Sequence, residues 1–241
     1  MLIERRAYTF RLGGMADFLD AQSMLGFDPV TRPIMARLMA YFIDATSRGD
    51  QIVHYWRFDS YDDWMARLHR KDPSREPYFR RVRPLMLKQE NRFMLPAPIP
   101  ALTPVWGNDR DWLPGSPPLE DLADYPALMV EESTFHLAPG GLPALWDGLR
   151  SCDLRSGAPL AQRLIACFYT LVGRQHEVVM LRWHGDMAAG REHAGWLAED
   201  RSWQTFLAGV APLLLDSSTR YMTLPALAAM CPLFRYPTGN P

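Results

Sequence analysis

The chain has 241 residues, of which 48% are hydrophobic, and its formal net charge is -1. This length is enough for one large domain or two modest ones, each with a core of its own. The near-neutral charge argues against a nucleic-acid surface, because phosphate binding needs a basic excess on one face.

The amino terminus, MLIERRAYTF, alternates like a strand and lacks the charged, apolar and small-residue regions of a signal peptide. The sequence holds no run of about 18 apolar residues, so we expect no membrane span and no membrane partner. Cys152, Cys167 and Cys231 are odd in number and unpatterned. They indicate reduced thiols in a cytoplasmic protein rather than a disulfide frame or a zinc site.

The first 95 residues alternate between strand-like and helix-like patterns. Asp59 or Ser60 is a good N-cap for a helix, since either side-chain oxygen can accept an unpaired amide of the first turn. We expect strands at residues 2–11, 37–44, from 51, and 88–95, with helices at residues 15–25, from about 60, and 78–87. The order β-α-β-β-α-β is that of a ferredoxin-like α+β unit.

The pattern then restarts after a proline-rich stretch. Residues 96–126 hold eight prolines, with Trp106 and Trp112 among them, and predict an extended segment strapped to the surface. Beyond it, RLIACF at residues 163–168 repeats RLMAYF at residues 37–42, and further ordered matches keep an offset of about 125 to 128. The chain is therefore divided into a first repeat (1–97), a linker (98–126), a second repeat (127–225) and a C-terminal tail (226–241).

The first repeat resembles the NIPSNAP family, which lies within the dimeric α+β-barrel superfamily. The resemblance rests on ERRAYTFRLG, on QIVHYWRFDSYDDW and on RVRPLMLKQENRFMLPAP. It implies that the two antiparallel sheets pack face to face as a barrel around a pocket. One chain could close that barrel, or two chains could pair crosswise as a homodimer. Related barrels include cofactor-free monooxygenases, polyketide cyclases, lactone isomerases and haem enzymes, so the resemblance does not fix a reaction.

Comparison of the two repeats predicts which side chains face the pocket. Leu38, Ala40 and Phe42 recur as Leu164, Ala166 and Phe168, so we expect that face to pack under the helices. The opposite faces would then line the pocket. They carry Arg37, Tyr41, His54, Trp56, Arg163, Tyr169, Arg182 and His184.

His54 is the leading catalytic candidate, with Tyr41 and His184 beside it. A buried imidazole near neutrality could act as a general base or donate to a carbonyl, although it could equally be a core histidine bonded to a carbonyl or carboxylate. His54 and His184 have no histidine at the matched position of the other repeat, and such asymmetry favours function. The other histidines on helices and turns, His69, His176 and His193, are expected to be exposed.

The predicted substrate-binding residues are aromatic or cationic. Trp56, with Tyr41, would give a flat wall for a ring-shaped ligand, or else fill the core. Tyr169 and Arg182 lie on the same predicted face. Arginines such as Arg37 and Arg163 could bind an anion, but their matched positions favour structural pairing with a carboxylate such as Glu90 or Glu132.

Several chemistries have no sequence support. The chain contains no G-x-S-x-G, P-loop or G-x-G-x-x-G motif. Glu131 and Glu132 are adjacent on a strand and point to opposite faces, so we expect no metal and no cofactor. The predicted function is cofactor-independent acid-base chemistry on a small, aromatic or polyketide-like metabolite of secondary metabolism. The rivals are a non-catalytic binding or scaffold protein with a filled barrel, and a haem protein with His54 or His184 as axial ligand.

Overall fold

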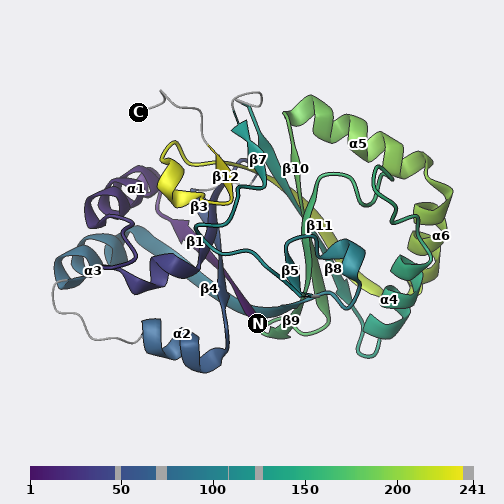
Figure 1. The fold of residues 1–241 in the computed structure, drawn as a ribbon, viewed down its shortest axis with the longest axis horizontal. Coiled ribbons are helices and arrows are strands. Elements are labelled where there is room, and N and C mark those ends of the chain that lie inside the picture. Colours follow the sequence, from purple (N-terminus) through teal and green to yellow (C-terminus); the bar gives the residue numbers. More distant parts are fainter. Residues whose placement is uncertain (47–49, 69–74, 108, 123–126, 236–241) are drawn as a thin grey trace. The chain divides into compact units, whose positions relative to one another are not determined.

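The computed structural model describes residues 1–46, 50–68, 75–107, 109–122 and 127–235, and Figure 1 traces them along the chain. These residues divide into two compact units. The first contains described parts of residues 1–93, 113–123 and 223–241, and the second contains those of 94–112 and 124–222.

The first unit has the predicted β-α-β-β-α-β order. Its elements are β1 (Leu2–Phe10), α1 (Gly14–Leu25), the 3-10 turn η1 (Pro33–Arg37), β2 (Leu38–Asp44), β3 (Gln51–Phe58), α2 (Tyr61–Leu68), α3 (Glu76–Val82), the turn η3 (Arg83–Leu85) and β4 (Met86–Pro96). The strand order is β4-β1-β3-β2, and β3 is antiparallel to both of its neighbours. A ferredoxin-like unit places its strands in this order.

The second unit repeats the same plan. Its elements are β8 (Met129–Leu137), α4 (Leu142–Arg150), β9 (Leu164–Val172), β10 (Glu177–His184), α5 (Met187–Glu199), α6 (Arg201–Val210), the turn η6 (Ala211–Leu213) and β11 (Leu214–Thr223). The strand order β11-β8-β10-β9 matches that of the first unit strand for strand. The predicted α+β fold of two tandem repeats with antiparallel sheets is confirmed.

The proline-rich stretch is structured where it is described. It contains the turn η4 (Pro100–Leu102) and the short strands β5 (Trp106–Gly107), β6 (Arg110–Asp111) and β7 (Glu120–Asp121). The fully buried Trp106 donates from Nε1 to the carbonyl oxygen of Trp112 at 2.8 Å and packs on Phe168 of the second unit. In the first unit, β7 pairs in parallel with β12 (Phe234–Arg235), beyond the turn η7 (Ala228–Met230).

Side-chain caps explain where several helices begin. Ser60 Oγ accepts from the amide of Asp63 at 3.2 Å, as expected for the start of α2. The carboxylates of Asp186 and Asp200 cap α5 and α6, accepting from the amides of Ala189 and Trp203 at 2.8 Å each. These bonds satisfy amides that have no partner within the helix.

The predicted assignment of sheet faces was wrong. In the first unit, β1 and β3 turn Tyr8, His54 and Trp56 toward the unit's own helices, where Tyr8 meets the ring of Phe18 on α1 at 6.0 Å. In the second unit, Cys167 and Met180 belong to one core cluster with residues of α4 and α6. The face bearing the differing residues is therefore the helix-packed face in both repeats.

Two features explain that error. The other face is equally buried, since Val53 and Phe42 are no more exposed than His54, so an apolar side chain does not identify the helix face. In addition, the pairing of β2 with β3 shifts between Leu38 and Ala40, and that of β9 with β10 shifts between Leu181 and Arg182. Each irregularity breaks the strict alternation on which the prediction relied.

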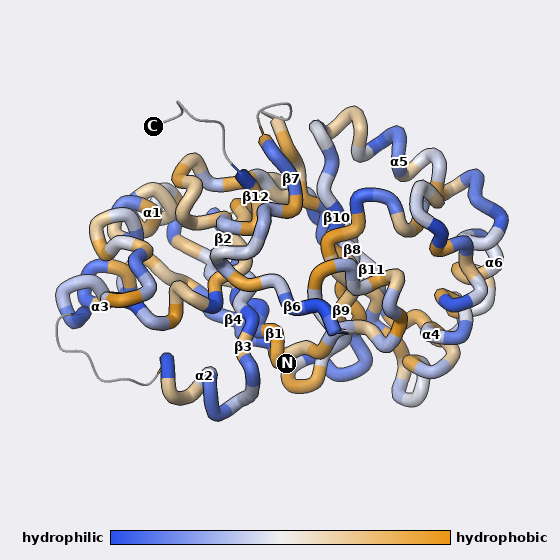
Figure 2. Tube along the Cα trace, viewed as in Figure 1, coloured by the Kyte–Doolittle hydropathy of each residue, from blue (hydrophilic) through white to orange (hydrophobic). Residues whose placement is uncertain are grey.

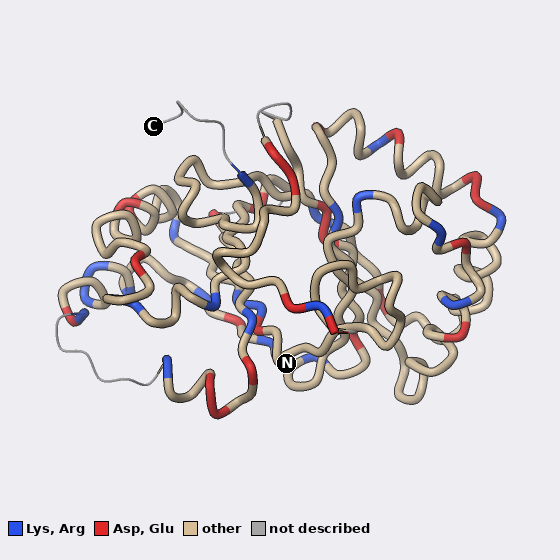
Figure 3. The backbone as a smooth tube through the Cα atoms, in the orientation of Figure 1, with Lys and Arg blue, Asp and Glu red and all other residues tan. Residues whose placement is uncertain are grey.

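Residue types are mixed along the described chain. Hydrophilic and hydrophobic residues alternate along α5 (Figure 2), and basic and acidic residues are interspersed along the described chain (Figure 3). No described helix combines the length and hydrophobicity that a bilayer-crossing helix requires.

Candidate functional site

A cavity of about 100 Å³ lies in the first unit between the sheet and the helices. Strands β1, β2 and β3 supply its floor, and α1, η1, α2 and α3 supply the remaining walls. Its lining includes Arg6, Arg32, Tyr41, His54, Trp56 and Tyr78. It thus contains three of the predicted site residues: Tyr41, His54 and Trp56.

The hydrogen bond between Trp56 and His54 fixes the imidazole tautomer. Trp56 Nε1 lies 2.6 Å from His54 Nδ1, and an indole nitrogen can only donate, so Nδ1 accepts. Burial, followed by the charges of Arg6 and Arg5, holds the pKa of His54 well below its usual value. The neutral ring therefore carries its proton on Nε2, and His54 presents a donor to the cavity rather than a basic lone pair.

Two buried arginines bring positive charge to the same cavity. Arg6 Nη2 binds Glu4 Oε2 at 2.6 Å, and its guanidinium lies 5.3 Å from the Trp56 ring. Burial acts to lower the pKa of Arg6, but Tyr8 and Glu4 outweigh it and the net shift is upward. Arg32 instead binds the neutral oxygens of Gly26 and Gln22, and burial lowers its pKa.

Aromatic rings enclose the imidazole. The Tyr41 ring stacks on His54 at 4.4 Å with an interplanar angle of 3°, and the Tyr8 ring meets it edge-on at 4.7 Å. Burial is the main cause that raises the pKa values of Tyr41 and Tyr78, so both hydroxyls stay protonated near neutral pH. The hydroxyl of Tyr78 accepts a hydrogen bond from the side-chain amide of Gln22.

Three donors on this cavity have no hydrogen-bond partner among the described residues: Arg6 Nε, Arg32 Nε and His54 Nε2. Each is a buried nitrogen, and leaving one buried donor unpaired costs about 1–3 kcal/mol. The only nearby carboxylate in these contacts, Glu4, already accepts from Arg6, Trp64 and Asn91. The cavity therefore suits a ligand that brings acceptor oxygens.

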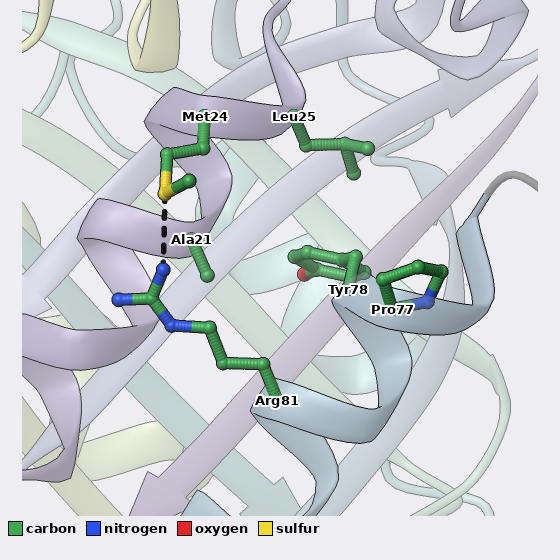
Figure 4. A pocket seen from close by; sticks show the side chains of 6 residues that line it. All are labelled: Ala21, Met24, Leu25, Pro77, Tyr78 and Arg81. Atoms are coloured by element: carbon green, nitrogen blue, oxygen red, sulfur yellow. Dashed lines mark hydrogen bonds between the residues drawn. The ribbon is translucent and has the colours of Figure 1, made fainter.

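Two further hollows lie beside the cavity in the same unit. A space of about 260 Å³ shares Arg6, Tyr8 and Tyr78 with it. A further groove of about 250 Å³ lies between α1 and α3, where Figure 4 shows the Tyr78 ring between the two helices. Leu25 and Tyr78 line both the groove and the cavity, so these two side chains separate the cavity from the groove.

The second unit contains a buried polar cluster at the matched end of its sheet. His184 Nε2 lies 3.0 Å from Glu131 Oε2, and Arg182 donates from Nη2 to the carbonyl oxygen of Leu160 at 2.7 Å. Burial acts to raise the pKa of Glu131, but the hydrogen bond to His184 and the charge of Arg182 lower it overall. His193 on α5 completes the cluster, and burial is the main cause that lowers its pKa.

The structure does not bring all predicted site residues together. Arg37 ends η1 rather than beginning a strand, and its guanidinium forms ion pairs with Asp59 and Asp63. Arg163 lies with its guanidinium 4.8 Å from the Trp183 ring. Tyr169 packs on Trp146 of α4 at 5.9 Å. The ion pairs of Arg37 are of the structural kind expected as its alternative, whereas Arg163 and Tyr169 contact aromatic rings.

Sequence reasoning missed several residues of these sites. Arg32 and Tyr78 lie on loop and helix positions that strand alternation cannot address. His193, expected to be exposed, is 2% exposed, because its face of α5 packs on the sheet. Glu131 could have been found, since it and Glu4 occupy matched positions in the two repeats. His69 lies outside the described residues.

The chain combines two βαββαβ units that share strand order, which defines a tandem-repeat α+β protein. The NIPSNAP family model matches residues 3–100 and 130–229, and the chain belongs to the NIPSNAP family. No curated protein matches it.

Three solved structures illustrate the likeness. A candidate monooxygenase from Lactobacillus acidophilus has a TM-score of 0.55 and 7% identity, with 92% of each chain covered. An anthrone oxidase-like protein also has a TM-score of 0.55, with 11% identity over 93% of this chain and 91% of its own. A NIPSNAP family protein from Agrobacterium tumefaciens is 24% identical over 43% of this chain and 91% of its own, with a TM-score of 0.39. The first two share the fold over nearly the whole chain.

Proposed function

We propose that this NIPSNAP protein is a cofactor-independent enzyme that acts on a small, flat metabolite bearing a carbonyl or phenolic oxygen. The observation that carries the proposal is the set of three unpaired donors, on Arg6, Arg32 and His54, around one cavity. Aromatic walls suit a ring, and converging donors suit an oxygen that gains negative charge. An aromatic or polyketide-like substrate from secondary metabolism has these features.

The chemistry would be proton transfer next to the carbonyl. A carbon–hydrogen bond of the substrate breaks, its proton passes to water, and the electron pair moves onto the oxygen as an enolate. His54 Nε2 and an arginine Nε donate to that oxygen, and stabilisation is strong because the donors are fixed and buried. His54 thus acts as an electrophilic donor, which replaces the general-base role expected from the sequence. The protonated Tyr78 hydroxyl can donate a further hydrogen bond to the same oxygen.

A second candidate is a binding protein without catalysis. One observation favours it: Glu4, the carboxylate beside Arg6, gives its oxygens to Arg6, Trp64 and Asn91 and is not poised as a base. In that case the cavity would hold the anionic form of a phenol or enol without turning it over. Haem is a poor fit for this cavity, because about 100 Å³ is far smaller than a porphyrin needs.

Two measurements separate these candidates. Titration with 4-nitrophenol below its pKa reports binding, since the donor set should favour the coloured phenolate and lower its apparent pKa by about one unit, a tenfold effect. Exchange of α-protons of an aryl ketone in D2O, followed by NMR, reports enolisation. An enzyme gives both signals, a binding protein gives only the first, and absence of both refutes the proposal.

Substitutions test whether phenolate binding and proton exchange take place in the cavity. His54→Phe keeps a ring against Tyr41 but removes the Nε2 donor, and it should weaken phenolate binding about tenfold or more, because a hydrogen bond to a charged group contributes about 1.5–3 kcal/mol. His176→Asn is a matched control that removes a half-buried imidazole elsewhere. Its positive φ of 58° is one that asparagine tolerates. Equal losses in both variants would count against the cavity.

A further inference from the structure

Three buried side chains of the second unit converge from three elements. Glu131 comes from β8, His184 from β10 and His193 from α5, and one potential ligand atom of each lies within 4.8 Å of the others. Their residues are 8%, 1% and 2% exposed. This cluster lies within the second unit and shares no residue with the cavity described above.

The hydrogen bond of His193 leaves a lone pair available. Its Nε2 lies 2.7 Å from the carbonyl oxygen of Pro159, which can only accept, so Nε2 carries the proton. In the neutral ring Nδ1 is then an acceptor, and it is buried without a hydrogen-bond partner among the described residues. Proteins orient metal-ligating imidazoles in this way, with the second ring nitrogen donating to a backbone carbonyl.

Glu131 supplies an oriented anionic oxygen. Ser133 Oγ donates to its Oε1 at 2.8 Å, and His184 lies at hydrogen-bonding distance from Oε2. One carboxylate and two imidazoles form a set that binds borderline divalent ions such as Zn2+, with one or more positions left open. The three candidate ligands are buried side chains from three different elements, so the site is not a cluster of acidic residues on the surface.

We propose that Glu131, His184 and His193 bind one divalent first-row transition-metal ion of the Zn2+ type. Two ligand atoms at about 2.1 Å from a common ion lie at most about 4.2 Å apart, so the cluster must contract by somewhat under 1 Å on binding. Small rotations of the Glu131 and His193 side chains are enough for a change of this size.

Arg182 sets the expected strength of the site. Its buried guanidinium interacts electrostatically with Glu131, so the metal would enter beside a positive charge. Removal of that charge should tighten metal binding severalfold. Adventitious binding at exposed histidines would not respond to Arg182, which gives the proposal a distinctive test.

The experiment titrates chelator-treated full-length protein with Co2+, followed by its visible absorption, and then displaces it with Zn2+. We expect one Co2+ per chain. His193→Gln retains a donor for Pro159 but lacks the Nδ1 lone pair, and Glu131→Gln lacks the charge; each should weaken binding about 30-fold or more. Arg182→Met should tighten it, and His176→Asn should leave it unchanged.

Clear outcomes would overturn the proposal. These are the absence of saturable binding in the folded wild type, or an affinity that is the same in His193→Gln as in wild type. Should His193→Gln fail to fold, the 15N resonance of His193 Nδ1 in the wild type decides, because ligation of Zn2+ must shift it and an unshifted resonance refutes ligation. Neither readout depends on enzymatic activity, so failure here leaves the proposed function of the first unit untouched.

Discussion

Replacing Trp56 by phenylalanine tests the assignment of His54 as a fixed donor. The change removes the indole N–H that lies 2.6 Å from His54 Nδ1 but keeps an aromatic ring at the site. Without this donor, His54 Nδ1 is a buried acceptor that has lost its hydrogen bond from Trp56. The imidazole is then free to place its proton on either nitrogen.

The energetic cost can be worked from the contacts. An unsatisfied buried acceptor costs about 1–3 kcal/mol. The cation–π contact of Arg6 with the Trp56 ring, at 5.3 Å, contributes about 0.5–2 kcal/mol, of which a phenylalanine keeps part. The unfolding free energy should therefore fall by about 1–4 kcal/mol. Since the unfolding free energy of a folded protein is about 5–15 kcal/mol, the variant should remain folded.

The assay is 15N–1H correlation of the imidazole in protein labelled at histidine. We expect a single neutral tautomer in the wild type, protonated on Nε2, and a mixture of tautomers in Trp56→Phe. Phenolate binding should weaken in the variant, because only part of the population presents Nε2–H to the cavity. A wild-type His54 protonated on Nδ1, or doubly protonated at pH 6, would refute the reasoning.

The same histidine predicts a pH dependence of stability. The pKa of His54 is lowered in the folded protein, so between that value and the unfolded value of about 6.5 the unfolded chain binds more protons. The contribution of neutral, buried His54 to the unfolding free energy is fully present above about pH 6.5. As the pH decreases below that value, the unfolding free energy falls by at most about 1.4 kcal/mol per pH unit. Urea unfolding between pH 7 and 5 should show a shallower slope in His54→Phe; an unchanged slope would contradict the lowered pKa.

Three further predictions concern local structure. Asp200→Ala removes the cap of α6 and should cost about 1 kcal/mol in urea unfolding, with no effect on metal binding. Gly148→Ala should destabilise by about 1–3 kcal/mol, because the added Cβ would lie 2.9 Å from Phe206 Cδ2. Gly209→Ala on α6 is its control, since nothing lies within 4 Å, and it should stabilise by about 0.5–1 kcal/mol; equal effects of the two glycine changes would refute the packing argument.

Much of the fold was predictable because it depends on local signals. Hydrophobic periodicity, the cap at Ser60 and the break at Gly13, whose φ is 76°, predict the order of the helices and strands. The helix expected at residues 78–87 is an exception, since α3 ends at Val82 and β4 begins at Met86. The repeat adds a second, independent copy of every signal. The matched segments at residues 37–42 and 163–168 therefore fixed the tandem architecture without any knowledge of contacts.

The orientation of side chains was not predictable in the same way. The sheet is buried on both faces, so alternation separates the two faces without saying which one meets the helices. The register shift at Leu38 and Ala40 depends on pairing with β3, which no local pattern records. Residues that reach a site from other elements, such as Arg32 and His193, required the tertiary structure.

The two buried glutamates show how the repeats diverged. Glu4 and Glu131 are each the third residue of their unit's first strand, and each faces the sixth residue of the neighbouring strand, Trp56 or Arg182. A glutamate at this strand position is therefore common to both repeats, but the residues that surround it differ between them.

In the first unit, Arg6 neutralises Glu4 on the same strand, and across the sheet His54 faces Arg6 at the edge of an open cavity. In the second, the equivalent cross-strand pair is Ser133 and Met180, and Met180 fills the core. The charge that balances Glu131 comes instead from the neighbouring strand. The differences between the repeats thus place a cavity in one copy and a histidine–carboxylate cluster in the other, each near the buried carboxylate of the matched strand position.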